Sequence, residues 1–292
     1  MKRILIIIAA LSAFYLVGCK KVDVNGDFES QGVGSYVTLL TQGKNTIDYS
    51  NLAGSKVDIT VKEYGAPVDS IRVYVSKGLA TTNKTVWRRV KSFAYSGDTK
   101  LEVSATEIAT ALGIPPTGLV PGETYTLYNE VKSKDGQLHD ITNMNSSMYG
   151  NPNYNAKMTW EATVICPYTG GMTGSFRVVV DEWVDWSPGD IVQVVAGAGP
   201  NELNLNQVWP NPIYGVATGP LTVSINPATG SATVAAGQNF ANYTCCGYTT
   251  NTGPGVSTGF VFSCTGDIRL RIRLTAPPYG DQGFFNLVLK KL

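Results

Sequence analysis

The stretch Ile268-Arg269-Leu270-Arg271-Ile272-Arg273-Leu274 alternates apolar and basic side chains without a break. Successive side chains of a strand point to opposite faces of its sheet, so this period of two predicts a β-strand with one buried apolar face. Three arginines then share the other face, where like charges repel unless solvent or acidic groups screen them. A row of planar donors also suits a carboxylate or a sulfate, so Arg271 is a candidate ligand-binding residue.

Strand-like alternation recurs along the chain. Val57–Val61 and Ile71–Val75 alternate strictly, and after residue 166 further strand-like runs are joined by short turns. Short links favour antiparallel neighbours, and roughly eight such strands close into a barrel or fold into a sandwich. A capping box at Ser104 and Glu107 opens the one predicted helix. The sequence therefore predicts an all-β fold that ends in an antiparallel meander, either a β-sandwich or a barrel.

The segment around Tyr125 resembles the E–F corner of fibronectin type III domains. Leu119, the pair Pro121-Gly122 and Tyr125 occupy the matching positions. The resemblance implies an Ig/fibronectin III-like β-sandwich over residues 35–165. It also implies that the Tyr125 hydroxyl bonds back to the backbone of the corner.

A domain boundary is predicted at Cys166-Pro167. The chain becomes poorer in charged residues and richer in glycine after this point. Residues 166–292 are therefore expected to form a separate antiparallel β domain.

Four cysteines lie beyond residue 19, namely Cys166, Cys245, Cys246 and Cys264. In an exported chain they indicate disulfides, and four cysteines allow three pairings. Adjacent side chains of an extended chain point to opposite faces, so only one of Cys245 and Cys246 is expected to reach Cys264. The other then pairs with Cys166 or stays a free thiol. A bond between Cys245 and Cys246 is the least expected arrangement.

The candidate catalytic motifs do not lie in the structural context that their chemistry requires. Gly255–Gly259 matches G-x-S-x-G, but a nucleophile elbow needs a strand before it and a helix after it, and here a strand follows. His139 is the one histidine, which leaves no familiar zinc cluster. Asp181 and Asp185 would suit an acid pair or a calcium site, with ordinary solvated acids as the structural alternative. No catalytic activity, cofactor or metal is expected, and the net charge of +1 gives no basis for nucleic-acid binding.

Aromatic residues crowd one part of the second region. Trp183, Trp186, Trp209 and Tyr214 are candidate ligand-binding residues, because sugar C–H faces stack on exposed rings. Packing in the core is the structural alternative for each Trp. Solvent exposure of the three Trp rings separates the two interpretations.

The N-terminus carries an export signal. A basic pair precedes an apolar run, Ile4–Val17, whose end is Leu16-Val17-Gly18-Cys19. A basic start, a short apolar run and a small residue before the cut are typical of a secretory signal peptide, here residues 1–18. The ending resembles the lipobox of bacterial lipoproteins. The resemblance implies lipid on Cys19 and a polar tether over residues 19–34.

The second region also resembles a group of surface lipoproteins. From Val164–Pro167 to the turn Tyr279–Gly283 it is similar to C-terminal β domains of lipoproteins found near Sus-type (starch-utilisation-like) transporters. The resemblance implies an accessory protein of an outer-membrane nutrient (glycan) uptake assembly. Such a protein is held by its lipid at the cell surface and binds an oligosaccharide or a transporter protein without catalysis. A structural or adhesive surface module with no small-molecule ligand is the alternative, and a glycoside hydrolase is disfavoured.

The lipobox leads to a direct prediction. Cys19→Ser should leave the protein uncleaved or soluble, because the thiol that receives the lipid is gone. Membrane fractionation and intact-mass measurement check this, and a mutant with unchanged membrane attachment and mass would contradict it.

Overall fold

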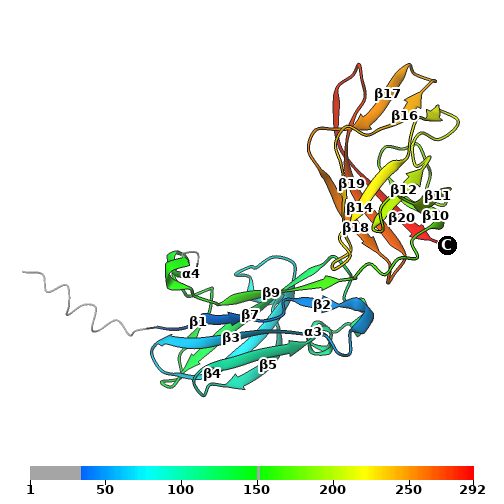
Figure 1. Ribbon diagram of the computed structural model, residues 1–292. Coiled ribbons are helices and arrows are strands. Elements are labelled where there is room, and N and C mark those ends of the chain that lie inside the picture. The colour runs from blue at the N-terminus through cyan, green and yellow to red at the C-terminus, as the bar shows by residue number, and fades with distance from the viewer. Residues whose placement is uncertain (1–33, 150–151) are drawn as a thin grey trace, which may run out of the picture.

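A computed structural model describes residues 34–149 and 152–292 of the chain. Figure 1 shows two β structures, a sandwich followed by a barrel that carries the C-terminus. The predicted all-β class is confirmed, since the helices are few and short. Cys19, the signal peptide and nearly all of the expected tether lie outside the described residues. No helix in the described part of the chain is long and apolar enough to cross a membrane.

The sandwich consists of a small sheet with the order β1-β3-β6 and a larger sheet with the order β2-β9-β7-β4-β5, in which β8 pairs with β7. Its strands are antiparallel except that β2 runs parallel to β9. This is the Ig/fibronectin III-like arrangement expected from the sequence. The strands are β1 (Ser35–Gln42), β2 (Thr46–Asp48), β3 (Lys56–Gly65), β4 (Val68–Lys77), β5 (Arg88–Ala94), β6 (Thr99–Ser104), β7 (Thr124–Ser133), β8 (Leu138–His139) and β9 (Thr159–Ile165).

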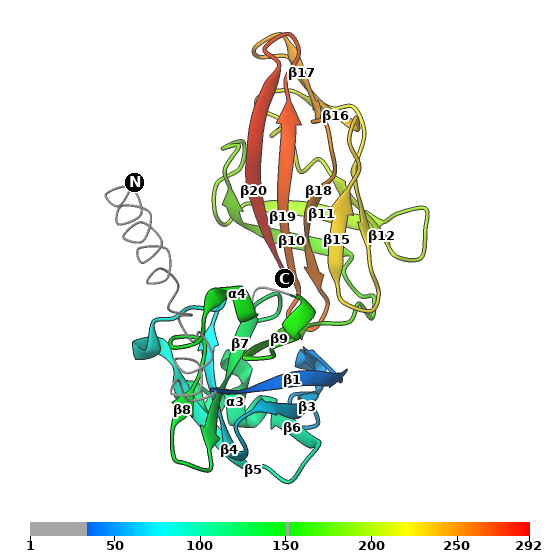
Figure 2. The same ribbon diagram turned by 90° about the vertical axis from the view of Figure 1, so that its left-hand side faces the viewer.

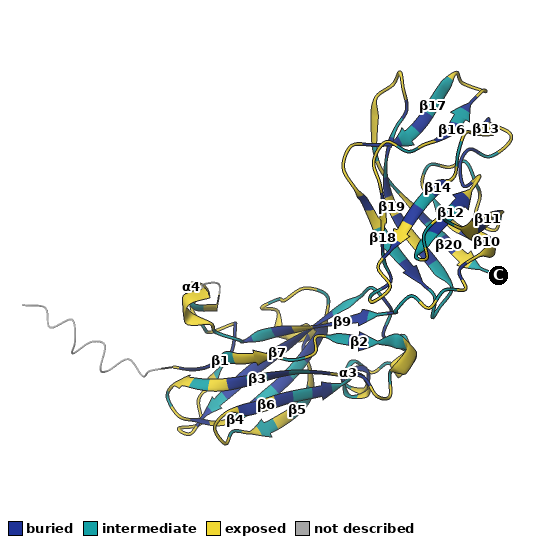
Figure 3. Ribbon diagram, viewed as in Figure 1, coloured by how far each residue is buried: buried dark blue, intermediate teal, exposed yellow. Residues whose placement is uncertain are grey.

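The alternating runs form the core of the sandwich. Val57, Ile59 and Val61 of β3 are fully buried, as are the apolar residues of Ile71–Val75 in β4 (Figure 3). Trp160 fills the centre, and its indole N–H donates to Asn129 Oδ1 over 3.1 Å. The indole N–H of Trp160 is therefore satisfied inside the core, as buried Trp residues usually are.

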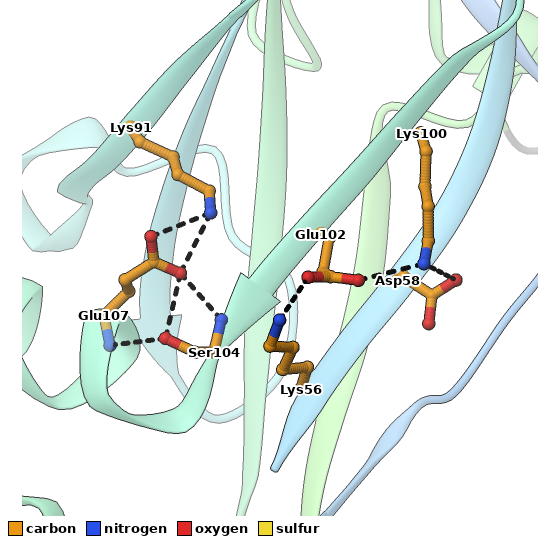
Figure 4. Close-up of polar contacts among 7 residues, drawn as sticks. All are labelled: Lys56, Asp58, Lys91, Lys100, Glu102, Ser104 and Glu107. Carbon is orange, nitrogen blue, oxygen red and sulfur yellow. Dashed lines mark hydrogen bonds and ion pairs between the residues drawn. The ribbon is translucent and has the colours of Figure 1, made fainter. Parts of the chain in front are cut away.

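The helix α3 (Ala105–Leu112) begins at the predicted capping box. The Ser104 hydroxyl accepts from the Glu107 backbone N–H, and the Glu107 carboxylate accepts from the Ser104 N–H at 2.8 Å (Figure 4). Lys91 on β5 also pairs with Glu107, which joins the helix to the larger sheet. The remaining short helices are α4 (Ser146–Tyr149) and the 3-10 turns η1 (Tyr49–Asn51), η2 (Lys84–Val86), η3 (Pro116–Gly118) and η4 (Pro152–Tyr154).

The corner before β7 holds Tyr125 in the core of the sandwich. The ring is buried, and its hydroxyl donates to Glu123 Oε2 over 3.0 Å. Burial raises the Tyr125 pKa to about 12, while a main-chain hydrogen bond from Val120 acts in the opposite direction. The hydroxyl thus bonds to the side chain of Glu123 beside the corner, an acid that the sequence did not indicate.

The second region closes into a barrel of antiparallel strands in the order β10-β11-β12-β14-β15-β18-β19-β20, and β20 pairs back onto β10. Strands β17, β16 and β13 extend the sheet from β19. The meander therefore forms a barrel. Its strands are β10 (Gly174–Asp181), β11 (Ile191–Ala196), β12 (Glu202–Asn206), β13 (Val216–Ala217), β14 (Leu221–Ile225), β15 (Ser231–Val234), β16 (Asn239–Tyr243), β17 (Tyr248–Thr252), β18 (Ser257–Phe262), β19 (Asp267–Thr275) and β20 (Asp281–Lys291).

The run Ile268–Leu274 lies in β19 with the orientation predicted. Its four aliphatic side chains are buried inside the barrel, while Arg269 and Arg271 are exposed on the outer wall. Burial of these aliphatic side chains stabilises the fold by about 1.5–3 kcal/mol each.

Cysteine pairing differs from the prediction. Cys166 is bonded to Cys264, with Cα atoms 6.0 Å apart, and Cys245 is bonded to Cys246. The expected bond from Cys264 to Cys245 or Cys246 is therefore wrong. Cys245 and Cys246 lie in the turn between β16 and β17, not in an extended strand, so their side chains are not forced to opposite faces.

The sandwich corner contacts the barrel beside the Cys166–Cys264 disulfide. Gly122 has a φ of +85°, and a Cβ there would lie 2.8 Å from the ring of Phe262. Only glycine fits this backbone conformation together with so close an approach. The corner glycine is thus required by the contact between the two structures as well as by the turn.

The two disulfides should differ in their effect on stability. Cys166–Cys264 spans 98 residues, so the double replacement by Ser should lower the free energy of unfolding by about 4.7 kcal/mol in the chain-entropy model. Cys245–Cys246 closes no long loop, and its double replacement serves as the matched control. Guanidinium unfolding of both variants measures the difference. If both double variants lost the same free energy of unfolding, the length of the loop closed by Cys166–Cys264 would not explain its effect on stability.

Candidate functional site

The loop between β10 and β11 is organised by a single carboxylate. Asp181, the last residue of β10, accepts the backbone N–H of Trp183 at 3.0 Å, of Asp185 at 3.1 Å and of Trp186 at 3.0 Å. Its Oδ2 also accepts the Trp209 indole N–H at 3.0 Å. These bonds hold Val184 between them at a φ of +67°, which is unfavourable for a β-branched residue. The loop is therefore fixed in a strained form that leaves Val184 75% exposed.

Behind this loop a second carboxylate joins a half-buried series of hydrogen bonds. The Trp183 indole N–H donates to the Tyr243 hydroxyl at 2.6 Å, which donates to Asp185 Oδ2 at 2.7 Å. The backbone N–H of Asn211 donates to the same carboxylate. Burial raises the pKa of Asp185 to about 6, and burial together with Asp185 raises the pKa of Tyr243. These hydrogen bonds tie three separate segments of the barrel together.

The three Trp rings do not form an exposed stacking surface. Trp209 is only 1% exposed, so the expectation that it binds ligand is wrong; its N–H is satisfied by Asp181 in the interior. Trp183 and Trp186 are half-buried against the barrel core, and Trp183 packs edge-on against Phe285 with centroids 4.8 Å apart. Because none of the three Trp rings is exposed, the structure favours a role in packing over stacking on a sugar.

An uncharged apolar surface lies around the same loop. We define the end patch as Val184, Ile213, Tyr214, Val216 and Tyr279, all of which are exposed. Hydrogen bonds connect its segments. Asn211 Nδ2 donates to the Asp185 carbonyl, and the Cys245 N–H donates to the Tyr214 carbonyl.

Tyr279 joins the patch through Tyr248, with ring centroids 5.8 Å apart. Figures 1 and 2 show β16 and β17, which carry the Cys245–Cys246 turn, at the end of the barrel away from the sandwich. Of the five predicted ligand-binding residues, only Tyr214 lies in the end patch.

The sequence holds a signal for this surface that residue motifs do not reveal. From Leu203 to Gly266 the chain contains no Asp, Glu, Lys, Arg or His. This segment supplies Ile213, Tyr214 and Val216 of the end patch. A charge-free stretch of that length is unusual on a soluble surface, where charged side chains normally keep molecules apart.

The acidic residues of this loop are all engaged in structure. Asp181 and Asp185 accept the bonds described above, and Asp190 accepts the Ser187 N–H at 2.8 Å. Glu182 accepts two bonds from Asn286. Asp181 and Asp185 are therefore half-buried and hydrogen-bonded within the protein, not ordinary solvated acids at the edge of a sheet. Residues 34–149 and 152–292 hold no group of three or more His, Cys, Asp or Glu that could bind a metal ion.

Arg271 lies elsewhere, on the outer wall of the barrel. It is exposed, and its guanidinium lies 4.7 Å from the centroid of the Phe284 ring. Its register partner Asn286 bonds to Glu182, the first residue of the β10–β11 loop, so Arg271 lies beside the start of that loop.

Comparisons with known proteins do not assign this chain to a family. No protein-family model and no curated protein matches the chain. Among solved structures, one similar chain comes from work titled as a study of host cell surface retention of a 1.5-MDa bacterial ice-binding adhesin. It has 10% sequence identity and a TM-score of 0.22, over 88% of this chain and 95% of that one. A score of this size does not establish a shared fold.

The buried acid makes the barrel sensitive to pH. Because the pKa of Asp185 is about 6 in the folded protein, against about 3.9 when unfolded, the folded state binds the extra proton between these values. Stability should therefore fall as the pH rises through this window. Asp185→Asn should remove that slope and be relatively more stable above pH 6. Thermal unfolding from pH 4 to pH 8 tests this, with the exposed Asp98→Asn as control. Parallel curves for wild type and Asp185→Asn would contradict it.

Proposed function

We propose that the chain is a lipid-anchored, non-catalytic binding protein of the bacterial cell surface. In this role it is an accessory component of an outer-membrane nutrient (glycan) uptake assembly, and its end patch binds a protein partner such as the transporter. The observation that carries the proposal is the exposed, charge-free end patch held rigid by Asp181 and Asp185. Large exposed apolar surfaces on soluble proteins mark interaction sites.

The composition of the end patch favours a protein over a sugar. Val184, Ile213 and Val216 are aliphatic, and such side chains bury well against another apolar surface but offer no ring for a sugar to stack on. Aromatic residues are enriched and charged residues depleted at the centre of protein interfaces, and Tyr214 and Tyr279 accompany these aliphatics. A rigid loop also lowers the entropy lost on binding, which strengthens association.

The position of the end patch suits a surface protein. The described chain starts at the sandwich, and β16 and β17 lie at the end of the barrel away from it (Figure 1). The turn between these strands bonds to Tyr214 of the end patch. A lipid on Cys19 lies upstream of the sandwich in sequence, so this arrangement directs the patch away from the anchored end. The same geometry serves the alternative role, a structural or adhesive module without a small-molecule ligand, which the buried Trp209 favours.

A charge in the end patch should break the proposed complex. Ile213 is 80% exposed, so Ile213→Asp should leave the fold intact but place a carboxylate in the interface. Leu79→Asp, at an 81% exposed position of the sandwich, is the matched control. The measurement is co-purification from detergent-solubilised membranes, followed by mass spectrometry.

The expected result is an outer-membrane transporter that accompanies the wild type and Leu79→Asp but not Ile213→Asp. Retention of the transporter by Ile213→Asp would refute the assignment of the end patch. A partner that is not an outer-membrane transporter would favour the adhesive role.

A further inference from the structure

A shallow groove of ≈ 620 Å³ lies on the outer wall of the barrel, across β15, β18, β19 and β20. We call this the outer groove. One row of its lining crosses all four strands in register, because Thr233 pairs with Thr258, Thr258 with Arg271, and Arg271 with Asn286. The side chains of this row are two hydroxyls, a guanidinium and an amide. The outer groove thus presents a continuous line of hydrogen-bonding groups.

The neighbouring row of the outer groove adds an aromatic ring. Phe260 is half-buried there and pairs in register with Arg269. Strands lie about 4.8 Å apart and residues two apart along a strand about 6.8 Å apart, so the two rows cover about 14 by 7 Å. This area is suited to a short oligosaccharide, whose hydroxyls meet the polar row while a C–H face meets the ring.

Arg271 differs from the other arginines of β19. Arg273 is held by Asp281, with Nη2 to Oδ2 at 2.7 Å, and Arg269 lies 3.6 Å from Asp267. Within the described chain, Arg271 has neither a hydrogen bond nor an ion pair, only its contact with the face of Phe284. Its guanidinium is therefore positioned by an aromatic ring while its donors remain available to an anion.

One acidic residue lies close enough to interact with Arg271. Glu182 accepts the Asn286 N–H at 2.7 Å and the Asn286 Nδ2 at 2.9 Å. These bonds, with a contribution from Arg271, lower the pKa of Glu182. On the other side of Arg271, β15 and β18 belong to the charge-free segment, so the outer groove holds no acid among its lining residues.

From these observations we infer that the outer groove binds an acidic oligosaccharide, with the carboxylate or sulfate of one sugar on Arg271. The guanidinium forms two parallel bonds to a carboxylate or to a sulfate. Two arginines are too few to follow a nucleic-acid backbone. The inference deepens the proposed function by giving the glycan a site and a chemical class, and it involves no residue of the end patch.

The test is calorimetric titration of the purified full-length protein with three defined probes. Tetragalacturonate supplies carboxylates, a sulfated tetrasaccharide supplies sulfates, and the methyl ester of tetragalacturonate is the neutral control. One of the charged probes should bind better than the ester, and its affinity should fall with added salt. The stronger charged probe identifies the anionic group.

Arg271→Gln should weaken binding of that probe by roughly tenfold to a hundredfold, the loss expected for a charge-assisted pair. Arg273→Gln changes the same strand and face outside the outer groove, and should bind as wild type does. Glu182→Gln should tighten binding a few-fold, because it removes the one competing charge. Thermal unfolding confirms that each variant is folded.

Binding of the ester equal to that of the charged probes would overturn the inference. So would wild-type affinity in Arg271→Gln, or no binding of any probe. Ile213→Asp should retain full affinity for the probe, so failure of the end patch and failure of the outer groove are distinguished by separate measurements.

Discussion

The barrel depends on β20, which pairs with β19 along one side and with β10 along the other. This double pairing leaves no open edge in the wall, so the backbone groups of the first and last strands bond to each other and not to another chain. It also places Asp181 opposite Leu287, and thereby lays the β10–β11 loop across β20. Glu182 and Trp183 then meet Asn286 and Phe285. The closure therefore adds Asn286 and Val288 of β20 to the outer groove. It also brings the β10–β11 loop, which carries Val184 of the end patch, against β20.

Two carboxylates, Asp181 and Asp185, hold the β10–β11 loop by internal hydrogen bonds. The Asp181 carboxylate accepts three backbone N–H groups of the loop and an indole N–H. Asp185 connects two further segments through Tyr243 and Asn211. Each bond to a charged group is worth about 1.5–3 kcal/mol, enough to hold Val184 in a backbone conformation it would otherwise avoid. The exposed residues of the end patch itself are apolar and uncharged. Asp181 and Asp185 thus fix the conformation of the loop, while their carboxylates point into hydrogen bonds within the protein.

Much of the fold was readable from the sequence because it depends on local pattern. Alternation identified β19 and the strands of the sandwich core, and the Ser104 capping box marked α3. Barrel closure was not readable, since it depends on the register between strands more than a hundred residues apart. The pairing of Cys166 with Cys264 was missed for the same reason, because the two residues are 98 positions apart in the chain. For Trp209 the sequence left core packing and ligand binding open, and the structure shows the ring buried. Arg271 was identified as a candidate, but its difference from Arg273 rests on Asp281, which no local rule connects to it. The charge-free segment from Leu203 to Gly266 was visible in the sequence, but only the structure shows which of its residues lie in the end patch and which line the outer groove.

The Cys166–Cys264 disulfide joins the point where the chain enters the second region to the turn between β18 and β19. More than half of the barrel sequence lies between these two residues, including the exposed turns of the end patch apart from that of Tyr279. A single peptide-bond cleavage anywhere in that interval leaves both fragments covalently joined. For a protein exposed to extracellular proteases, the bond therefore guards against shedding. The barrel can be nicked at its most accessible loops and still remain attached to whatever holds the sandwich.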